Sequence, residues 1–600
     1  MISLTNEKNL KKRDLRGLLA RLGKYVFHEW YLFIPAILFT LISNQLALMG
    51  PRFSGAAIDA ITDTAGVQFD SMWANVIRMI MCYAGSALLA YVLAVIMVHL
   101  GQRIVYRMRK QVFDKLLTLP VGYFDTHPTG DIISHLSYDI DTLNATLSHD
   151  LVQIMTSVYT VLGSLYFMWQ ISKPMILIFA VTVPISILLA AIRAKKVKPL
   201  FRARAKKYGE LNGYAEEMLS GMRTISVYGK EDVISERFSA RNKEAMDFSY
   251  KAEYYGSAMG PTMNLMNNLS ISLVAMIGGI LYMLSVGGKV EEGTLFFITL
   301  GGIAQFVQYS RKFVGPINEF ANIMHEFQSA FSAAERIFAI IDEEPEKADS
   351  ESPISLPNPR GEVELDSVNF GYIPERMILK DFSVKAKAGQ TVAIVGPTGA
   401  GKTTVINLLM RFYDVNSGEI RLDSVPIYDM RRDELRAAYT MVLQDSWLFS
   451  GTIYENIIYG KENATRDEVE AAARAARISS YIERLPDGYD TVLADGGNNI
   501  SKGQRQLITI ARAILSDAPM LILDEATSNV DSRTEIQIQK ALATLMQGRT
   551  SFVIAHRLST IQNADIILVV RDGRITESGT HSELLSLGGF YSKLYNSQFT

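Results

Sequence analysis

The chain has 600 residues, 48% of them hydrophobic, and a net charge of -2. This length exceeds that of a typical single domain, and the hydrophobic content excludes a disordered protein. The small net charge gives no reason to expect a nucleic acid partner. The single cysteine, Cys82, excludes an internal disulfide and a metal cluster held by cysteines. We therefore expect two or more domains that are held together by packing alone.

Uninterrupted runs without Asp, Glu, Lys or Arg divide the chain. Each run is close to or above the roughly 18 to 20 residues that span a bilayer as a helix. Soluble helices carry polar faces, so a succession of such runs predicts a membrane domain of six helices. The runs cover residues 30–51, 79–102, 151–172, 174–192, 254–288 and 293–310.

Basic residues alternate between the connections and predict the orientation of the spans. The first 29 residues and the segment 193–253 are rich in Lys and Arg, whereas the connections near 52–78, at 173 and at 289–292 have few. The positive-inside tendency therefore places both termini in the cytoplasm, with a multi-pass domain in the cell membrane. Within the N-terminal segment 1–29, the stretch from Leu15 to Tyr25 is amphipathic and predicts an interfacial helix.

The remaining text predicts the domain boundaries. We expect a transmembrane domain over 30–335, with long cytoplasmic helix extensions interrupted by proline and glycine at Phe124 to Asp139 and at Met218 to Asp232. The acidic, proline-rich segment 336–360 is typical of a linker. Residues 361–600 open with alternating strand-like text and predict a soluble α/β domain. The predicted fold class is an all-α six-helix membrane domain followed by an α/β nucleotide-binding domain.

A phosphate-binding loop opens this second domain. The text "QTVAIVGPTGAGKTT" (Gln390 to Thr404) places an apolar strand directly before G-x-x-x-x-G-K-T. Its glycines let backbone amides wrap a phosphate, Lys402 reaches the terminal phosphates, and the Thr403 hydroxyl can ligate Mg²⁺. The motif predicts ATP and Mg²⁺ as cofactors. The predicted nucleotide-binding residues of the loop are Gly396, Thr398, Gly399, Ala400, Gly401, Lys402, Thr403 and Thr404.

Two further apolar strands are followed by candidate catalytic groups. "PMLILDEATSNVD" contains Asp524 and Glu525 directly after its apolar run. An acid at such a strand end can hold Mg²⁺ through water, and an adjacent acid can polarise the water that attacks the γ-phosphate. About thirty residues later, "FVIAHRLST" delivers His556. Together with the phosphate-binding loop, these residues predict a centre for nucleotide hydrolysis.

The order GPTGAGKTT, VLQDSWLF, ISKGQRQ, LILDEATSNVD and AHRLST after six spans resembles an ATP-binding-cassette exporter half-transporter over essentially the whole chain. The resemblance implies a translocase driven by ATP hydrolysis. It implies that Gln444 senses Mg²⁺ and the membrane domain, that Tyr372 stacks on adenine and that Asp531 belongs to the D-loop. Glu525 becomes the catalytic carboxylate and His556 the switch histidine. The two interrupted stretches near 124–139 and 218–232 become coupling helices.

The signature sequence of this family would be "ISKGQ", residues 500 to 504, which resembles LSGGQ. It keeps Ser501, Gly503 and Gln504, but Lys502 replaces a glycine that lets backbone approach phosphate closely. The resemblance implies that the signature of one subunit closes over the ATP held by the other. Either the lysine is tolerated in a homodimer, or it marks a slow site in a heterodimer with a related half-transporter. We favour the heterodimer.

The transported compound is less clearly indicated. The run 254–288 carries several methionines, which suit variable apolar ligands, and asparagines, which inside a membrane face protein or a cavity; ordinary helix packing explains the same residues. We expect membrane lipids and a hydrophobic or amphipathic small molecule as partners, with export of the multidrug type. A homodimeric lipid flippase is the alternative, and an ATP-gated channel or nucleotide-sensing receptor is the alternative of another class.

Overall fold

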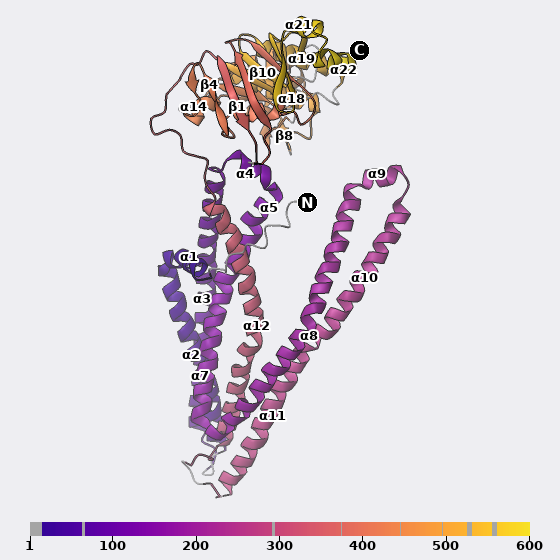
Figure 1. Ribbon diagram of the computed structural model, residues 1–600. Coiled ribbons are helices and arrows are strands. Elements are labelled where there is room, and N and C mark those ends of the chain that lie inside the picture. Colours follow the sequence, from indigo (N-terminus) through magenta and orange to yellow (C-terminus); the bar gives the residue numbers. More distant parts are fainter. Residues whose placement is uncertain are drawn as a thin grey trace. The chain divides into compact units, whose positions relative to one another are not determined.

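The computed structural model describes residues 15–62, 66–287, 289–290, 294–373, 375–443, 446–494, 496–524, 531–554 and 561–599, without the side chains of 15, 317–322, 324–325 and 597–599. The chain forms two compact units. The first comprises Met1–Leu117 with Gly130–Glu343, and the second comprises Thr118–Thr129 with Glu344–Thr600. The first unit is helical and the second combines helices with sheets (Figure 1).

Long helices build the first unit. Helix α1 (Leu15–His28) precedes α2 (Trp30–Ile61) and α3 (Phe69–Leu116). A continuous helical stretch follows, made of α5 (Thr129–Ser134), η2 (His135–Asp139), α6 (Ile140–Ala145), η3 (Thr146–Asp150) and α7 (Leu151–Ile171). The rest are α8 (Lys173–Ser220), α9 (Met222–Val227), α10 (Glu231–Ser257), α11 (Met259–Val286) and α12 (Leu300–Asp342).

Five helical stretches in the described part of the chain are long and apolar enough to cross a membrane. They contain the first five predicted spans. The residues of the sixth predicted span, 293–310, are helical from Leu300 on, where α12 begins, and this helix is less apolar than the other five stretches. The physical reason lies in its composition, because polar Gln305 and Gln308 and two glycines interrupt the apolar residues before Arg311.

The polar start of α12 is held by α2. Asp59 on α2 accepts hydrogen bonds from the backbone N–H of Gly301 at 2.7 Å and from the Thr299 hydroxyl at 3.0 Å. A Cβ on Gly301 would lie 2.1 Å from the carbonyl oxygen of Gly55, so the two backbones approach too closely for a side chain. The small and polar residues that weaken the membrane-span signal are therefore those that allow this helix pair to form.

The far end of α12 extends beyond the expected start of the linker at 336. The helix continues to Asp342 because Ile337, Phe338 and Ile340 are buried against the rest of the unit. Arg21 on α1 donates two hydrogen bonds to the Asp342 carboxylate. The residues that read as the first part of a linker are therefore helical and packed.

The stretch from α8 to α11 forms an arm (Figure 1). Helix α8 runs beside α10 and α11, and the short α9 reverses the chain at the tip. The interruption expected at Met218 to Asp232 is this reversal. Leu219, Val227 and Tyr228 at the tip are each more than two-thirds exposed.

The described residues of the second unit form two larger sheets and a small antiparallel pair, β7 with β8. The first has the order β2-β1-β4-β5 with antiparallel pairing; the second has the order β12-β11-β3-β10-β9-β6 and is parallel except at β12. The strands are β1 (Val363–Phe370), β2 (Leu379–Ala386), β3 (Thr391–Val395), β4 (Ser417–Leu422), β5 (Val425–Pro426), β6 (Tyr439–Val442), β7 (Gly451–Thr452), β8 (Val492–Leu493), β9 (Met520–Asp524), β10 (Thr550–Ile554), β11 (Ile566–Arg571) and β12 (Arg574–Gly579).

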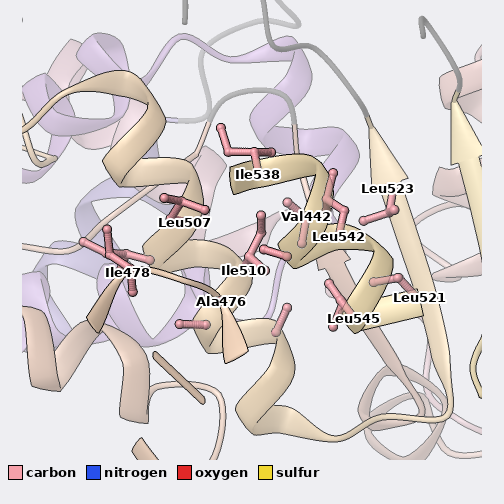
Figure 2. Close-up of a cluster of buried hydrophobic side chains, with 14 of the residues drawn as sticks. Val442, Ala476, Ile478, Leu507, Ile510, Leu521, Leu523, Ile538, Leu542 and Leu545 are labelled. Atoms are coloured by element: carbon pink, nitrogen blue, oxygen red, sulfur yellow. The ribbon is translucent and has the colours of Figure 1, made fainter. Parts of the chain in front are cut away.

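The second unit also contains helices that follow or connect its strands. They are α13 (Lys402–Leu409), α14 (Arg432–Ala437), α15 (Ile453–Ile458), α16 (Arg466–Ala475), α17 (Ser479–Ile482), η4 (Gly488–Asp490), α18 (Lys502–Ser516), α19 (Ser532–Met546), α21 (His581–Ser586) and α22 (Phe590–Phe599). Figure 2 shows how Leu507 and Ile510 of α18 and Ile538 and Leu542 of α19 pack in one cluster with Leu521 and other strand residues. This core fixes the ends of the strands at which the candidate site lies.

Candidate nucleotide-binding site

The loop between β3 and α13 adopts a conformation that depends on glycine. Gly396, Gly399 and Gly401 have φ angles of 154°, 82° and 103°, a region that side-chain-bearing residues rarely enter. A Cβ on Gly396 would lie 2.1 Å from the carbonyl oxygen of Val570 on β11, whereas one on Gly399 would meet nothing within 4 Å. The loop therefore wraps tightly at its first glycine and is open to a ligand at its second.

Lys402 bridges this loop. Its Nζ donates hydrogen bonds to the carbonyl oxygens of Gly396 at 2.8 Å and Pro397 at 3.1 Å. Burial lowers the pKa of the ammonium group, and the nearby charge of Asp524 partly offsets that effect. The structure thus brings Lys402 and Asp524, two predicted site residues, into electrostatic contact. The half-buried Lys402 ammonium group, which now donates to carbonyl oxygens of its own loop, is well placed to donate hydrogen bonds to phosphate oxygens instead.

The side chains at the start of α13 divide by burial. Thr398 and Thr403 are exposed, whereas Ala400 and Thr404 are only 4% and 5% exposed. Ala400 and Thr404 therefore pack in the domain core, and a phosphate would reach their backbone amides at most. The N-terminus of α13 adds the positive end of a helix dipole.

Tyr372 lies beside the loop. Its hydroxyl is 3.3 Å from the Thr404 hydroxyl oxygen and accepts a hydrogen bond from Asn407 at 3.2 Å. Its ring meets those of Phe370 and Tyr413 edge-on, with centroids 5.0 Å apart in both cases, and remains 46% exposed. A ring fixed at its edges with an open face suits stacking on a nucleobase. The role of Asn407 in fixing it was not predicted, although its position one turn after Thr404 is a usable signal.

The carboxyl ends of the parallel strands share one edge of the sheet. Asp524 at the end of β9 pairs in register with Ile554 at the end of β10, which in turn lies beside β3. Ligands of such sheets bind outside these ends. Three predicted catalytic residues, Gln444, Glu525 and His556, lie outside the described residues.

The signature segment forms the start of α18. Ser501 is the N-cap: its hydroxyl accepts a hydrogen bond from the Gln504 N–H at 3.3 Å, and the Gln504 side chain accepts one from the Ser501 N–H at 2.8 Å. Lys502 is the first helical residue and is half-buried, with no positive φ. Replacement of the expected glycine by lysine therefore causes no backbone strain here. Gly503, which follows, is buried.

Asp531 also caps a helix. Its carboxylate accepts a hydrogen bond from the Thr534 N–H at 2.9 Å at the start of α19. This backbone hydrogen bond lowers the pKa of the carboxyl group.

A short helix from the other end of the sequence belongs to the same unit. In α4 (Val121–Thr126), Asp125 accepts a hydrogen bond from the Tyr413 hydroxyl at 2.5 Å, and a Cβ on Gly122 would lie 2.9 Å from the Tyr413 ring. Tyr413 in turn contacts Tyr372. The stretch 124–139 expected to contain a coupling helix begins in the middle of α4. Nothing in the local sequence identifies Tyr413 as its partner.

The fold and this site define an ATP-binding-cassette transporter. Residues 32–303 match the family described as the ABC transporter transmembrane region, and residues 379–528 match the ABC transporter family of the nucleotide-binding domain. The chain belongs to the ATP-binding-cassette exporters and is an ATPase-coupled translocase with helices that cross a membrane, as the sequence predicts.

Several relatives cover nearly the full chain. It is 40% identical over 593 residues to an uncharacterized ABC transporter ATP-binding protein, YfiC, of Bacillus subtilis, covering 99% of this chain and 96% of that one. It is 38% identical to a fatty acid ABC transporter ATP-binding/permease protein of Mycobacterium bovis (98% and 97% covered) and 34% identical to an ATP-dependent lipid A-core flippase of Desulfotalea psychrophila (96% and 99%). A bacterial Atm1-family ABC exporter with ATP bound superposes with a TM-score of 0.75 at 28% identity, covering 95% of this chain and 98% of that one.

Proposed function

We propose that this chain is one subunit of a dimeric exporter that moves amphipathic, lipid-like compounds across the cell membrane, with both termini in the cytoplasm. One observation carries the proposal: a single chain contains both a unit of membrane-length helices and a glycine-dependent phosphate loop. In that loop Lys402 is in electrostatic contact with Asp524. Two relatives carry lipid-related names, a fatty acid transporter and a lipid A-core flippase. This supports a lipid-like substrate over a purely multidrug one.

In this proposal each site residue has a chemical role. The Lys402 ammonium exchanges its two loop carbonyls for phosphate oxygens, and the Tyr372 ring stacks on adenine. Thr403, Asp524 and Gln444 would hold Mg²⁺, which neutralises charge on the phosphates. Glu525 polarises the attacking water, and His556 orients the terminal phosphate. Thr403 fits its role because its side chain is exposed at the start of α13.

We propose a heterodimer as the assembly. Ser501 and Gln504 present the N-terminus of α18, which attracts anions, to the nucleotide of the partner. Because Lys502 lies at the first helical position without strain, its effect must come from its side chain and not from a distorted backbone. A long cation at that place changes how closely the helix end approaches phosphate. The site it completes would turn over slowly, while the site formed by Lys402 and Glu525 with the partner's signature would be fast.

The test is to purify the tagged full-length chain from its native membrane and identify what copurifies in stoichiometric amount. ATPase activity is then measured for the wild type, for Glu525→Gln and for Glu462→Gln, a matched change at an exposed carboxylate. We expect a second, related cassette chain and loss of nearly all activity in Glu525→Gln only.

A chain that purifies alone and is active would replace the heterodimer by a homodimer whose signature tolerates lysine. ATPase activity that survives Glu525→Gln would contradict the proposed catalytic centre. Stimulation by fatty acids or lipids, compared with cationic drugs, tests the substrate class, and stimulation by the drugs alone would contradict a lipid-like substrate.

A further inference from the structure

A basic groove lies where α2 begins beside the last third of α3. It has a volume of about 780 Å³ and is lined by Glu29, Val98, His99, Gln102, Arg103, Tyr106, Arg107 and Lys110. Three of these residues are permanent cations and one is an anion. All lie within the first compact unit.

The single anion of the groove serves to hold its cations. The Glu29 carboxylate is almost fully buried and accepts hydrogen bonds from Arg107 at 2.8 Å and from the Tyr31 hydroxyl at 2.5 Å. Arg103 lies 3.6 Å from the same carboxylate, and its side chain is 58% exposed. Arg107 therefore neutralises the negative charge of Glu29. Arg103 also donates a hydrogen bond to the Tyr31 hydroxyl, but its side chain is more than half exposed. Lys110 is exposed, so the groove presents an excess of positive charge.

The depth of the groove matches the headgroup region of a bilayer. The charge-free run 79–102 is long enough to cross the hydrocarbon core, and Arg103 is the first charge after it. From Arg103 to Lys110 the helix rises by roughly 10 Å, which is comparable to the headgroup layer. Helix α1, with its amphipathic sequence, ends just before Glu29. Trp30 and Tyr31 follow, as aromatic residues do at membrane interfaces.

An apolar strip leads from the groove into the membrane segment of α3. Leu88, Tyr91, Val95 and Val98 recur at helical spacing and are 64%, 70%, 41% and 61% exposed. His99, in the groove, donates a hydrogen bond from its Nδ1 to the Val95 carbonyl oxygen at 2.9 Å. One face of α3 therefore changes from apolar to basic at the depth where a lipid changes from acyl chain to headgroup.

We propose that this groove binds the phosphate headgroup of an anionic phospholipid of the cytoplasmic leaflet, with an acyl chain along the exposed apolar strip of α3. Basic pockets between membrane helices on the cytoplasmic side have the chemistry to recognise such headgroups. The cytoplasmic side follows from chain continuity, since the end of α3 leads directly into Thr118–Thr129 of the unit that carries the ATP site. The inference does not depend on the transported compound.

The test compares lipid binding to the purified full-length protein by native mass spectrometry. Phosphatidylglycerol and phosphatidylcholine with the same acyl chains are titrated onto wild type, onto the double variant Arg103→Gln/Lys110→Gln, and onto Lys195→Gln/Lys196→Gln. The last pair lies on α8 and controls for the loss of two surface charges. Arg107 is left in place because its removal would leave Glu29 buried without its cation.

We expect wild type and the α8 control to prefer phosphatidylglycerol. The groove variant should bind it about 30-fold more weakly, since each basic residue near a membrane surface contributes about a fivefold factor. Phosphatidylcholine binding should be unchanged in all three. ATPase activity in neutral detergent, equal to wild type, reports that the groove variant is folded.

Equal phosphatidylglycerol binding by the groove variant and wild type would overturn the proposal, as would an equal loss in the α8 control. A separate arm titrates sn-glycerol 3-phosphate, which has the headgroup chemistry without acyl chains. Binding as strong as that of the lipid would show a site for a soluble phosphate and would overturn the lipid assignment. Binding far weaker than that of the lipid supports it.

Discussion

The phosphate loop allows a sharp comparison between two glycine-to-alanine variants in one motif. In Gly396→Ala the new Cβ would lie 2.1 Å from the Val570 carbonyl oxygen, where a carbon and an oxygen normally stay about 3.3 Å apart. Neither backbone can yield easily, because β3 and β11 are paired from Ile566↔Val392 to Val569↔Val395. In Gly399→Ala the new Cβ meets nothing within 4 Å, so only the positive φ opposes it.

The two variants therefore differ by the cost of a clash. Left-handed backbone costs an alanine about 1–2 kcal/mol at either position, and forced overpacking adds about 1–3 kcal/mol at Gly396. If the loop must recover its conformation to hold ATP, Gly399→Ala weakens binding by about 5- to 30-fold. Gly396→Ala weakens it by at least about fivefold more.

The assay is equilibrium binding of a fluorescent ATP analogue to the purified transporter, with thermal unfolding measured in parallel. Gly396→Ala should also lower the unfolding temperature more than Gly399→Ala does, because the clash is present without nucleotide. Equal ATP affinities for the two variants, or tighter binding by Gly396→Ala, would refute the reasoning that the first glycine is fixed by close backbone approach.

Three further predictions concern stability and coupling. Arg336, whose side chain is 46% exposed, donates two hydrogen bonds to the buried Asp139 carboxylate, at 2.8 and 2.5 Å, and His135 contacts the same carboxylate. Arg336→Gln should therefore destabilise the first unit by about 1–2 kcal/mol. In thermal unfolding, Asp139→Leu/Arg336→Met should recover most of that loss, and no recovery would count against the pair. Asp125→Ala removes the hydrogen bond between α4 and Tyr413 and should reduce substrate-stimulated ATPase at unchanged ATP affinity, while Asp131→Ala, an exposed neighbour, should not. Hydrogen bonds from Lys461 and Thr465 lower the pKa of Glu468 to about 2, below its unfolded value of about 4.3. The contribution of Glu468 to folding stability is therefore present above about pH 4.3 and is lost as the pH falls toward 2. Unfolding followed by fluorescence should show a smaller loss of stability over that pH range in Glu468→Gln than in the wild type, and identical pH profiles would contradict this prediction.

The sequence was sufficient for the features that depend on local chemistry. Charge-free runs identified α2, α3, α7, α8 and α11, since a soluble helix rarely lacks charge over the full thickness of a bilayer. The sixth predicted span is helical only from Leu300, the start of α12. Its register is decided by Asp59 and Gly55 on α2, which contact Gly301 across more than two hundred positions of sequence, and no single-sequence pattern reports such a contact.

In the candidate site, too, the features encoded by local sequence were predicted and those that depend on distant contacts were not. The loop glycines and Lys402 were predicted because backbone conformation and charge are encoded residue by residue. The edge contacts that fix the Tyr372 ring, and the link from Tyr413 to Asp125, join segments that are distant in sequence. Burial also could not be predicted from the motif: Ala400 and Thr404 belong to the matching pattern, yet their side chains face the core.

Lys502 is still expected to alter the nucleotide site that α18 completes, but for a different physical reason. From the sequence, a lysine in place of glycine suggested an obstructed backbone. In the structure its backbone is ordinary helix, and the Ser501–Gln504 capping box on either side of it is formed. What remains is a cationic side chain at a helix end that attracts anions. Lys502→Gly should therefore leave the stability of α18 nearly unchanged, because the cap is retained, and should alter only the turnover of the site that this helix completes. A large loss of stability in that variant would mean that the lysine serves the helix and not the nucleotide.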